Sequence, residues 1–234
     1  MRTAPESITI PSRDGLPLSA LWMTPEAVPG AVTVPGVVVL HGYGSRKENH
    51  VDFAERLAGL GMAVVIPDLR GHGETGSEMD EGMIGDVLAC LDHLQAEGCG
   101  PLGIRGSSMG GFLALTAAPL HPDVRAVVAI CPARPESLAR RLEHDWPLAH
   151  PLEASTWRDD GIARGFWHAR DDEVVPWQGT SALVTRAHQP KHLRIEMGGD
   201  HRSLQHDPKT QADTAAFMHH ALKTHASPPS VSGT

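Results

Sequence analysis

The segment GSSMG at residues 106–110 constrains the fold of this chain more than any other part of it. It joins an apolar run, Pro101–Arg105, to a run rich in helix-forming residues, Phe112–Ala118. This context predicts a short buried strand, a sharp turn and a packed helix. Glycines on both sides of the turn remove side chains that would collide with the neighbouring strand or helix, so Ser108 can stand clear of the backbone.

Ser108 is therefore a candidate nucleophile at the N-terminus of a helix. Unpaired N–H groups and the helix dipole favour negative charge at such a position. The N–H of Met109 is then placed to stabilise an oxyanion. The alternative is a glycine-rich loop with an ordinary serine, because a G-x-S-x-G segment also arises by chance. The rest of the sequence decides between these two interpretations.

Runs of buried β-branched residues alternate with helical segments along the chain. The predicted buried strands are Gly36–Leu40, Met62–Ile66, Pro101–Arg105, Ala126–Ile130, Ile162–Trp167 and Leu193–Met197. The other predicted helices are Asp52–Leu60, Ile84–Ala96, Thr180–His188 and Thr210–Lys223. Two further segments, Ser7–Ile10 and Leu16–Trp22, flank an Asp-Gly turn and predict an antiparallel hairpin. The pattern predicts an α/β fold with a mostly parallel, doubly wound sheet and an antiparallel N-terminal edge.

Length and composition set further limits. The 234 residues are enough for one domain, which we place at 1–225, with a disordered Ser/Pro/Gly tail at 226–234. A net charge of −8 argues against broad binding to nucleic acid or anionic membranes. The cysteines lack C-x-x-C spacing, and we predict neither a metal nor a cofactor. Without a signal-like N-terminus or a membrane-length apolar run, we expect a soluble, cytoplasmic protein.

A serine hydroxyl needs a base to accept its proton, and the base needs an acid to orient it. Such groups gather at the carboxyl ends of parallel strands. Three segments follow predicted strands in this way: His41–Gly44, His168–Pro176 and Gly198–Arg202. In the first, two glycines allow close backbone approach, and the N–H of Tyr43 is a candidate second oxyanion donor.

The second and third segments supply the acid and the base. Three acids share the second loop: Asp171, Asp172 and Glu173. Position alone does not choose among them. In the third segment His201 follows a strand, whereas His192 precedes that strand and His206 lies further into the next connection. His201 is therefore the predicted base, and the chain order is serine, acid, histidine.

Taken together, these segments resemble the α/β-hydrolase superfamily over nearly the whole chain. The matching segments are His41–Gly44, Asp68–Gly73, Gly106–Gly110, His168–Pro176 and Gly199–His201. The resemblance implies that Ser108 is the nucleophile and His201 the base. It also selects Asp172 as the acid, because family members place it in an H-G-x-x-D-x-x-V-P pattern, with Ala169 here in place of the usual glycine. Tyr43 and Met109 carry over as oxyanion donors.

The chain is most similar to small serine carboxylesterases and esterase-like peptidases of that superfamily. The resemblance implies hydrolysis of a small-molecule carboxylic ester by a Ser-His-Asp triad through an acyl-enzyme. The alternatives are a thioesterase or peptidase with the same triad, or a hydrolase-like binding protein without catalysis. The sequence does not predict an oligomeric state.

Residues 132–161 form a long connection between two predicted strands. We interpret this segment as a small helical cap over the site, and the alternative is one surface helix with an ordered loop. Its leucines and tryptophans suggest an apolar acyl or alcohol group of modest size. We predict substrate contacts from Trp146 and Trp157 in this segment and from His41 at the end of the first buried strand.

The sequence disfavours two other classes of site. The segment Gly71–Gly76 has the form G-x-G-x-x-G after a strand, but carboxylates rather than a helix-forming run follow it, which disfavours a dinucleotide site. A metal hydrolase is disfavoured because the chain has no H-E-x-x-H motif, and the adjacent His219 and His220 would point in different directions on a helix.

Overall fold

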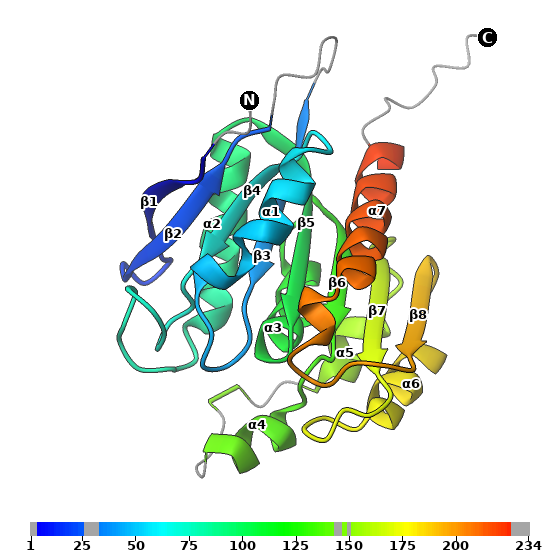
Figure 1. Ribbon diagram of the computed structural model, residues 1–234. Helices are drawn as coiled ribbons and strands as arrows, with labels where there is room; N and C mark the ends of the chain where they lie inside the picture. Colours follow the sequence, from blue (N-terminus) through cyan, green and yellow to red (C-terminus); the bar gives the residue numbers. More distant parts are fainter. Residues whose placement is uncertain (1–3, 26–32, 143–146, 149–150, 226–234) are drawn as a thin grey trace, which may run out of the picture.

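The computed structural model describes residues 4–25, 33–142, 147–148 and 151–225. Within these residues, eight strands form one sheet in the order β1-β2-β4-β3-β5-β6-β7-β8 (Figure 1). The strands are β1 (Glu6–Pro11), β2 (Pro17–Met23), β3 (Val34–Leu40), β4 (Ala63–Pro67), β5 (Cys99–Ser107), β6 (Val124–Ile130), β7 (Ala163–Ala169) and β8 (Lys191–Glu196). The β1–β2 and β2–β4 pairs are antiparallel, and the other pairs are parallel. The predicted parallel sheet with an antiparallel N-terminal edge is confirmed.

Helices cover both faces of the sheet (Figure 1). The α-helices are α1 (Val51–Ala58), α2 (Met83–Ala96), α3 (Met109–Ala117), α4 (Pro135–Leu142), α5 (Leu152–Thr156), α6 (Trp177–Thr185) and α7 (Pro208–His225). Short 3-10 helices are η1 (Lys47–His50), η2 (Ala118–Leu120) and η3 (Leu204–His206). One face packs against α1 and α7, and the other against α2, α3, α5 and α6.

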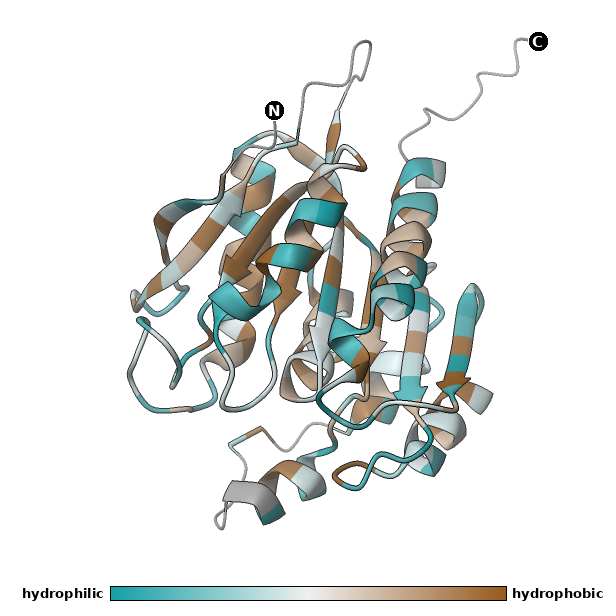
Figure 2. Ribbon diagram, viewed as in Figure 1, coloured by the Kyte–Doolittle hydropathy of each residue, from teal (hydrophilic) through white to brown (hydrophobic). Residues whose placement is uncertain are grey.

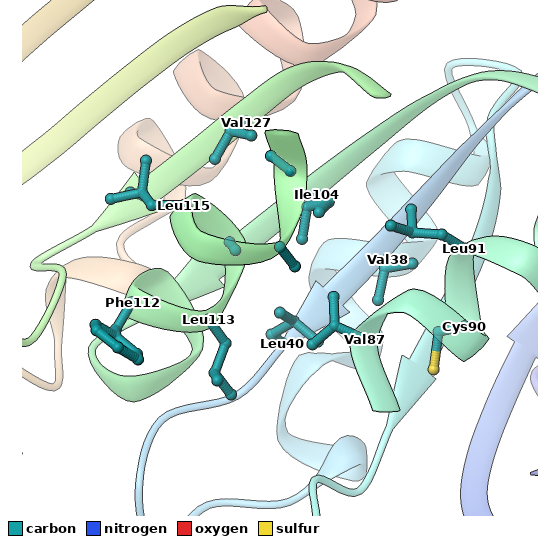
Figure 3. Packing of buried hydrophobic residues seen from close by; sticks show 14 of the residues in the cluster. Val38, Leu40, Val87, Cys90, Leu91, Ile104, Phe112, Leu113, Leu115 and Val127 are labelled. Carbon is teal, nitrogen blue, oxygen red and sulfur yellow. The ribbon is translucent and has the colours of Figure 1, made fainter. Parts of the chain in front are cut away.

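Alternation along the strands divides the core into two layers. In β3, Val37 and Val39 belong to the layer beneath α1 and α7, whereas Val38 and Leu40 belong to the opposite layer. Figure 3 shows the second layer, where Val38 and Leu40 lie between side chains of α2 and α3. A strand buried on both faces therefore needs an unbroken apolar run, which is the pattern that predicted β3, β4 and β6.

The edge strand β8 differs from this pattern. Its residues are half-buried or exposed, and Figure 2 shows hydrophilic and hydrophobic positions alternating along it. The strand begins at Lys191, so His192 lies inside β8 and not before it. The centre of the His192 ring lies 5.0 Å from the centre of the Trp167 ring. The predicted position of His192 outside the strand was wrong, because β8 begins two residues earlier than the predicted strand Leu193–Met197.

The connection between β6 and β7 contains two short helices, α4 and α5. In Figure 1, α4 lies beyond the carboxyl ends of the strands, and α5 packs against α3. Leu138, Leu148 and Leu152 in this connection are buried in the core layer of α2 and α3. The apolar residues that suggested an apolar substrate therefore serve packing at these three positions.

Candidate active site

The turn predicted at residues 106–110 lies between β5 and α3, with Ser108 at its centre. The backbone angles of Ser108, φ 51° and ψ −116°, are strained for a residue with a side chain, at a cost of about 1–3 kcal/mol. A Cβ atom on Gly106 would lie 2.1 Å from the carbonyl oxygen of Gly110, and one on Gly110 would lie 2.6 Å from that of His41. Close backbone approach therefore requires both glycines.

Main-chain hydrogen bonds fix this strained serine on both sides. The N–H of Ser108 donates to the carbonyl oxygen of Ile130 at the end of β6, over 2.9 Å. The carbonyl oxygen of Ser108 accepts hydrogen bonds from the N–H groups of Phe112 and Ala133, each over 3.0 Å. The position of the hydroxyl is thus set by the backbone of three neighbouring segments.

The imidazole of His201 lies between Ser108 and Asp172. Its Nε2 is 2.8 Å from the Oγ of Ser108, and its Nδ1 is 2.7 Å from the Oδ2 of Asp172. An ionised carboxylate can only accept hydrogen bonds, so Nδ1 carries a proton, and in the neutral ring Nε2 is left to accept the proton of the serine hydroxyl. The structure thus brings together three side chains that are far apart in the sequence.

Asp172 is held as a carboxylate by four donors. Its Oδ1 accepts the N–H groups of Val174 and Val175, each over 2.8 Å. Its Oδ2 accepts from His201 and lies 3.2 Å from the Nε2 of His168. Burial raises the pKa of this carboxyl group, but the hydrogen bonds from the two imidazoles and the Val175 N–H outweigh burial and hold its pKa well below the usual value.

His168 is a residue whose part in the site sequence reasoning missed. It is fully buried, its Nδ1 is 2.9 Å from the Oγ1 of Thr180, and its Nε2 is 2.9 Å from the carbonyl oxygen of Val175. A proton on Nε2 can therefore be shared between that carbonyl and Asp172. The signal was present in the sequence, because His168 sits at the end of β7 in the same segment as the acid.

One group of ligand-type side chains among the described residues could share an ion. The donor atoms of Cys131, His168 and Asp172 lie within 4.8 Å of one another, and all three residues are buried. Burial raises the pKa of the Cys131 thiol well above its usual value, which keeps it protonated at neutral pH. The donor atoms of the other two already take part in the hydrogen bonds described above, so the set fits a packed proton-bonded cluster better than a metal centre.

Two backbone segments meet beside the Ser108 hydroxyl. Met109 is the first residue of α3, and the first hydrogen bond at this end of the helix runs from Phe112, so the Met109 N–H has no partner within the helix. On the other side, a Cβ atom on Gly42 would lie 3.3 Å from the Cβ of Ser108. The turn that carries Tyr43 therefore passes close to the serine.

His41 is placed differently from the prediction of a substrate contact. It is fully buried, its Nε2 accepts the N–H of Leu69 over 2.9 Å, and its Nδ1 is 2.8 Å from the carbonyl oxygen of Gly42. Burial lowers the pKa of His41 to about 4, so the ring is neutral at pH 7. These contacts make His41 a support for the 42–44 turn.

Trp157 does not line the site either. The Nε1–H of Trp157 donates to the carbonyl oxygen of Leu183 over 2.8 Å, and the Arg186 guanidinium lies 4.0 Å from the centre of its ring. Trp157 therefore packs between α5 and α6 and does not make the predicted substrate contact. Trp146 lies outside the described residues.

A cavity of about 340 Å³ opens beside Ser108, and we call it the serine cavity. It is lined by Gly42, Tyr43, Gly44, Ser45, Asn49, Ser107, Ser108, Val174, His201, Arg202, Gln205 and His206. A larger hollow of about 850 Å³ lies between α1 and α7, but it contains none of the predicted site residues. The candidate nucleophile and base therefore both line the serine cavity, and the volume of this cavity suits a small substrate.

Known proteins resemble this chain in sequence and in fold. The family model for serine aminopeptidases of family S33 matches residues 34–149. The structure of the α/β-hydrolase GrgF from Penicillium sp. sh18 superposes with a TM-score of 0.79 at 14% identity, covering 94% of this chain and 100% of GrgF. The chain therefore has the α/β-hydrolase fold.

Two curated relatives of this chain extend the comparison. A Bacillus subtilis (strain 168) protein named as an esterase, YitV, is 27% identical over 212 residues, which cover 72% of this chain and 83% of YitV. The mouse (Mus musculus) palmitoyl-protein thioesterase ABHD10 is 27% identical over 214 residues, which cover 72% of this chain and 69% of ABHD10. The family model and both relatives bear the names of hydrolases.

The G-x-G-x-x-G segment of this chain has a structural role. The carboxylate of Asp68 accepts the N–H of Glu74 over 2.9 Å and pairs with the buried Lys47 over 2.7 Å. The loop thus wraps around an internal carboxylate, and the next helix begins only at Met83. A dinucleotide site needs free N–H groups at a helix that starts directly after the glycines.

Among the described residues, the structure contains no helix with the length and apolar character of a membrane span.

Proposed function

We propose that this chain is a serine hydrolase that cleaves carboxylic esters of small molecules through an acyl-enzyme. The observation that carries the proposal is the continuous set of hydrogen bonds from the Ser108 hydroxyl through His201 to Asp172, over 2.8 and 2.7 Å. It ends at a carboxylate that stays ionised because four donors surround it. This is the arrangement that activates a serine hydroxyl at neutral pH.

In the first step, the Oγ of Ser108 attacks the ester carbonyl carbon while the Nε2 of His201 accepts the hydroxyl proton. Asp172 keeps the proton on Nδ1 and stabilises the imidazolium that forms. The N–H groups of Tyr43 and Met109 donate to the oxyanion, each contributing about 3 kcal/mol to the lowering of the barrier. When the tetrahedral intermediate collapses, the Nε2 proton passes to the departing alkoxide, which leaves as the alcohol.

In the second step, His201 takes a proton from water, and the hydroxide formed attacks the acyl-enzyme carbonyl. Collapse of this second intermediate breaks the bond to Ser108, and the Nε2 proton returns to its Oγ. The acid product leaves, and the site is restored. Ser108 lines the serine cavity, which supports access of water to the acyl-enzyme between the two steps.

A thioesterase with the same mechanism is the second candidate, and the similarity to ABHD10 favours it. The test is hydrolysis of para-nitrophenyl esters of increasing chain length, run beside acyl-CoA thioesters and aminoacyl anilides. We expect turnover of short-chain esters and its loss in Ser108→Ala. Preference for the thioesters would select the second candidate. A folded protein that hydrolyses none of the three classes contradicts both.

A further inference from the structure

The charge of the serine cavity differs from that of the whole chain. The chain carries a net charge of −8, yet none of the described residues that line the cavity is acidic. One of them, Arg202, is a permanent cation. The remaining polar lining consists of hydroxyl, amide and imidazole groups. The one charged side chain in this wall that is always ionised is therefore a cation, which can bind an anion.

Arg202 lies in the wall of the serine cavity. The turn that carries it is fixed by Asp200, whose Oδ1 accepts the N–H groups of Arg202 and Ser203, each over 2.8 Å. Its side chain is exposed and makes no ion pair among the residues that the structure describes. By contrast, Arg134 pairs with Glu153, and Arg164 pairs with Asp160 over 2.7 Å. Arg134 is thus engaged in an ion pair, whereas Arg202 lines the serine cavity.

A second cation lies behind the cavity wall. Arg105 of β5 is fully buried, and its guanidinium donates to the carbonyl oxygen of Gln205 over 3.1 Å and lies 4.5 Å from the centre of the Phe53 ring. Gln205 in turn accepts the Ser107 hydroxyl, and both residues line the cavity. No carboxylate is hydrogen-bonded to this guanidinium among the described residues.

Arg105 keeps its charge in this position. Burial lowers the pKa of Arg105 to about 10, which leaves it protonated at pH 7, and the attraction of Asp52 opposes part of that shift. Burial lowers the pKa of His206 in the cavity wall, and the Arg105 charge lowers it further, while Asp52 opposes them. Two arginines thus place positive charge in and behind the wall of the serine cavity, while the carboxylates of Asp172 and Asp200 lie behind His201 and in the turn of Arg202.

We propose that the ester substrate carries a carboxylate close to the scissile bond, which Arg202 binds at the serine cavity. The planar guanidinium can donate two parallel hydrogen bonds to a carboxylate, and the hydroxyl and amide groups of the wall supply further donors. This inference rests on the proposed esterase function and specifies its substrate class. The carboxylate can belong to the acyl part or to the alcohol part of the ester.

The test compares matched charged and neutral esters on the purified chain. For the acyl part, the pair is monoethyl succinate and ethyl methyl succinate, followed by ethanol release. For the alcohol part, the pair is para-carboxyphenyl butanoate and its methyl ester, followed by release of the phenol. The measured quantity is the ratio of kcat/KM for the charged ester to that for the neutral one, which cancels general losses of activity.

We expect this ratio to fall about fivefold in Arg202→Gln for one of the two pairs, and that pair identifies the part that carries the carboxylate. Arg202→Lys keeps the charge and should retain most of the ratio. Arg158→Gln removes an equal charge from an exposed residue outside the cavity wall and should leave the ratio unchanged. The preference in the unaltered chain should also shrink when salt rises from about 0.05 to about 0.5 M.

A ratio that is the same in Arg202→Gln and the unaltered chain for both pairs overturns the carboxylate proposal. If the neutral esters are still hydrolysed in that case, the esterase function stands and only the substrate class is wrong. If no ester of either kind is hydrolysed by the folded chain, the esterase function itself is wrong.

Discussion

The turn that carries Ser108 and the loop that carries His201 face each other across 2.8 Å, but they are held in opposite ways. The serine turn is buried, and close backbone packing together with main-chain hydrogen bonds defines it. The histidine loop is largely exposed, and side chains hold it: Asp200 bonds to two N–H groups, and its own N–H donates to the Oγ of Ser203 over 2.8 Å. The nucleophile is thus fixed by packing and the base by a few polar contacts.

Because of this difference, substitutions should have different effects in the two regions. A change in the serine turn should alter the stability of the whole fold, because three strands or helices meet there. A change in the histidine loop should alter the alignment of one imidazole and leave the core intact. The predictions below run from the largest expected effect to the smallest.

Ser108 should be the position where activity and stability separate most. Both Ser108→Ala and Ser108→Gly should lower kcat about 10⁵-fold, because no nucleophile remains. Glycine accepts φ 51° without strain, whereas alanine does not, so the glycine variant should be the more stable of the two by about 1 kcal/mol. Ester hydrolysis and urea unfolding measure the two effects. A glycine variant clearly less stable than the alanine variant would show that the turn stores no strain.

Asp172→Asn should lower kcat about 10³- to 10⁴-fold, since an amide cannot hold His201 in the required tautomer. The fold should survive, because the Val174 and Val175 N–H groups can still donate to the amide oxygen. Asp171→Asn is the matched control, because the neighbouring carboxylate is exposed and outside the hydrogen-bonded set. If Asp171→Asn is the variant that loses activity, the acid has been assigned to the wrong residue.

Gly110→Ala and Gly198→Ala place the same methyl group in the two regions. At Gly110 it would meet the carbonyl oxygens of His41 and Leu40 at 2.6 Å, and we expect a loss of about 3 kcal/mol in the free energy of unfolding. At Gly198 nothing lies within 4 Å, so stability should change by less than about 0.5 kcal/mol. Thermal unfolding distinguishes the two, and equal losses would contradict the contrast between the regions.

The support beneath the serine turn should also be sensitive to acid. The folded pKa of His41 is lowered to about 4 by burial, against about 6.5 in the unfolded chain, so the folded state resists protonation. Its contribution to stability is complete above pH 6.5 and declines as the pH falls from 6.5 to 4, by about 3 kcal/mol in all.

Urea unfolding at a series of pH values measures this decline. In His41→Asn the loss between pH 6.5 and 4 should be smaller by most of that amount, whereas His220→Asn, exposed on α7, should leave the curve unchanged. An unchanged acid loss in His41→Asn means that another group is responsible.

The same contrast explains which parts of the molecule the sequence predicts. The strands β3, β4 and β6 are buried on both faces, so unbroken apolar runs in the sequence predict them. The turn at Ser108 needs glycines at fixed positions. These are local requirements, written in adjacent residues. The helix predicted over Asp52–Leu60 is found at Val51–Ala58, since its end depends on how Gly59–Gly61 fold and not on the helix itself.

The acid and the substrate contacts depend on tertiary placement, and there the sequence is less informative. Three neighbouring acids could serve His201, and only the family pattern selected Asp172. Trp157 looks the same in sequence whether it faces a cavity or packs against Arg186. The exposure of Arg202 to the serine cavity is likewise set by the path of the loop after β8, which no local pattern encodes.

The most direct measurement of the central claim is labelling of the folded chain with a fluorophosphonate, followed by mass spectrometry of its peptides. We predict a single adduct on Ser108 and a labelling rate at least about 10³-fold lower in His201→Ala. No adduct on the folded chain, or a rate that is unaffected by the loss of His201, would contradict the activation of Ser108 by its imidazole neighbour.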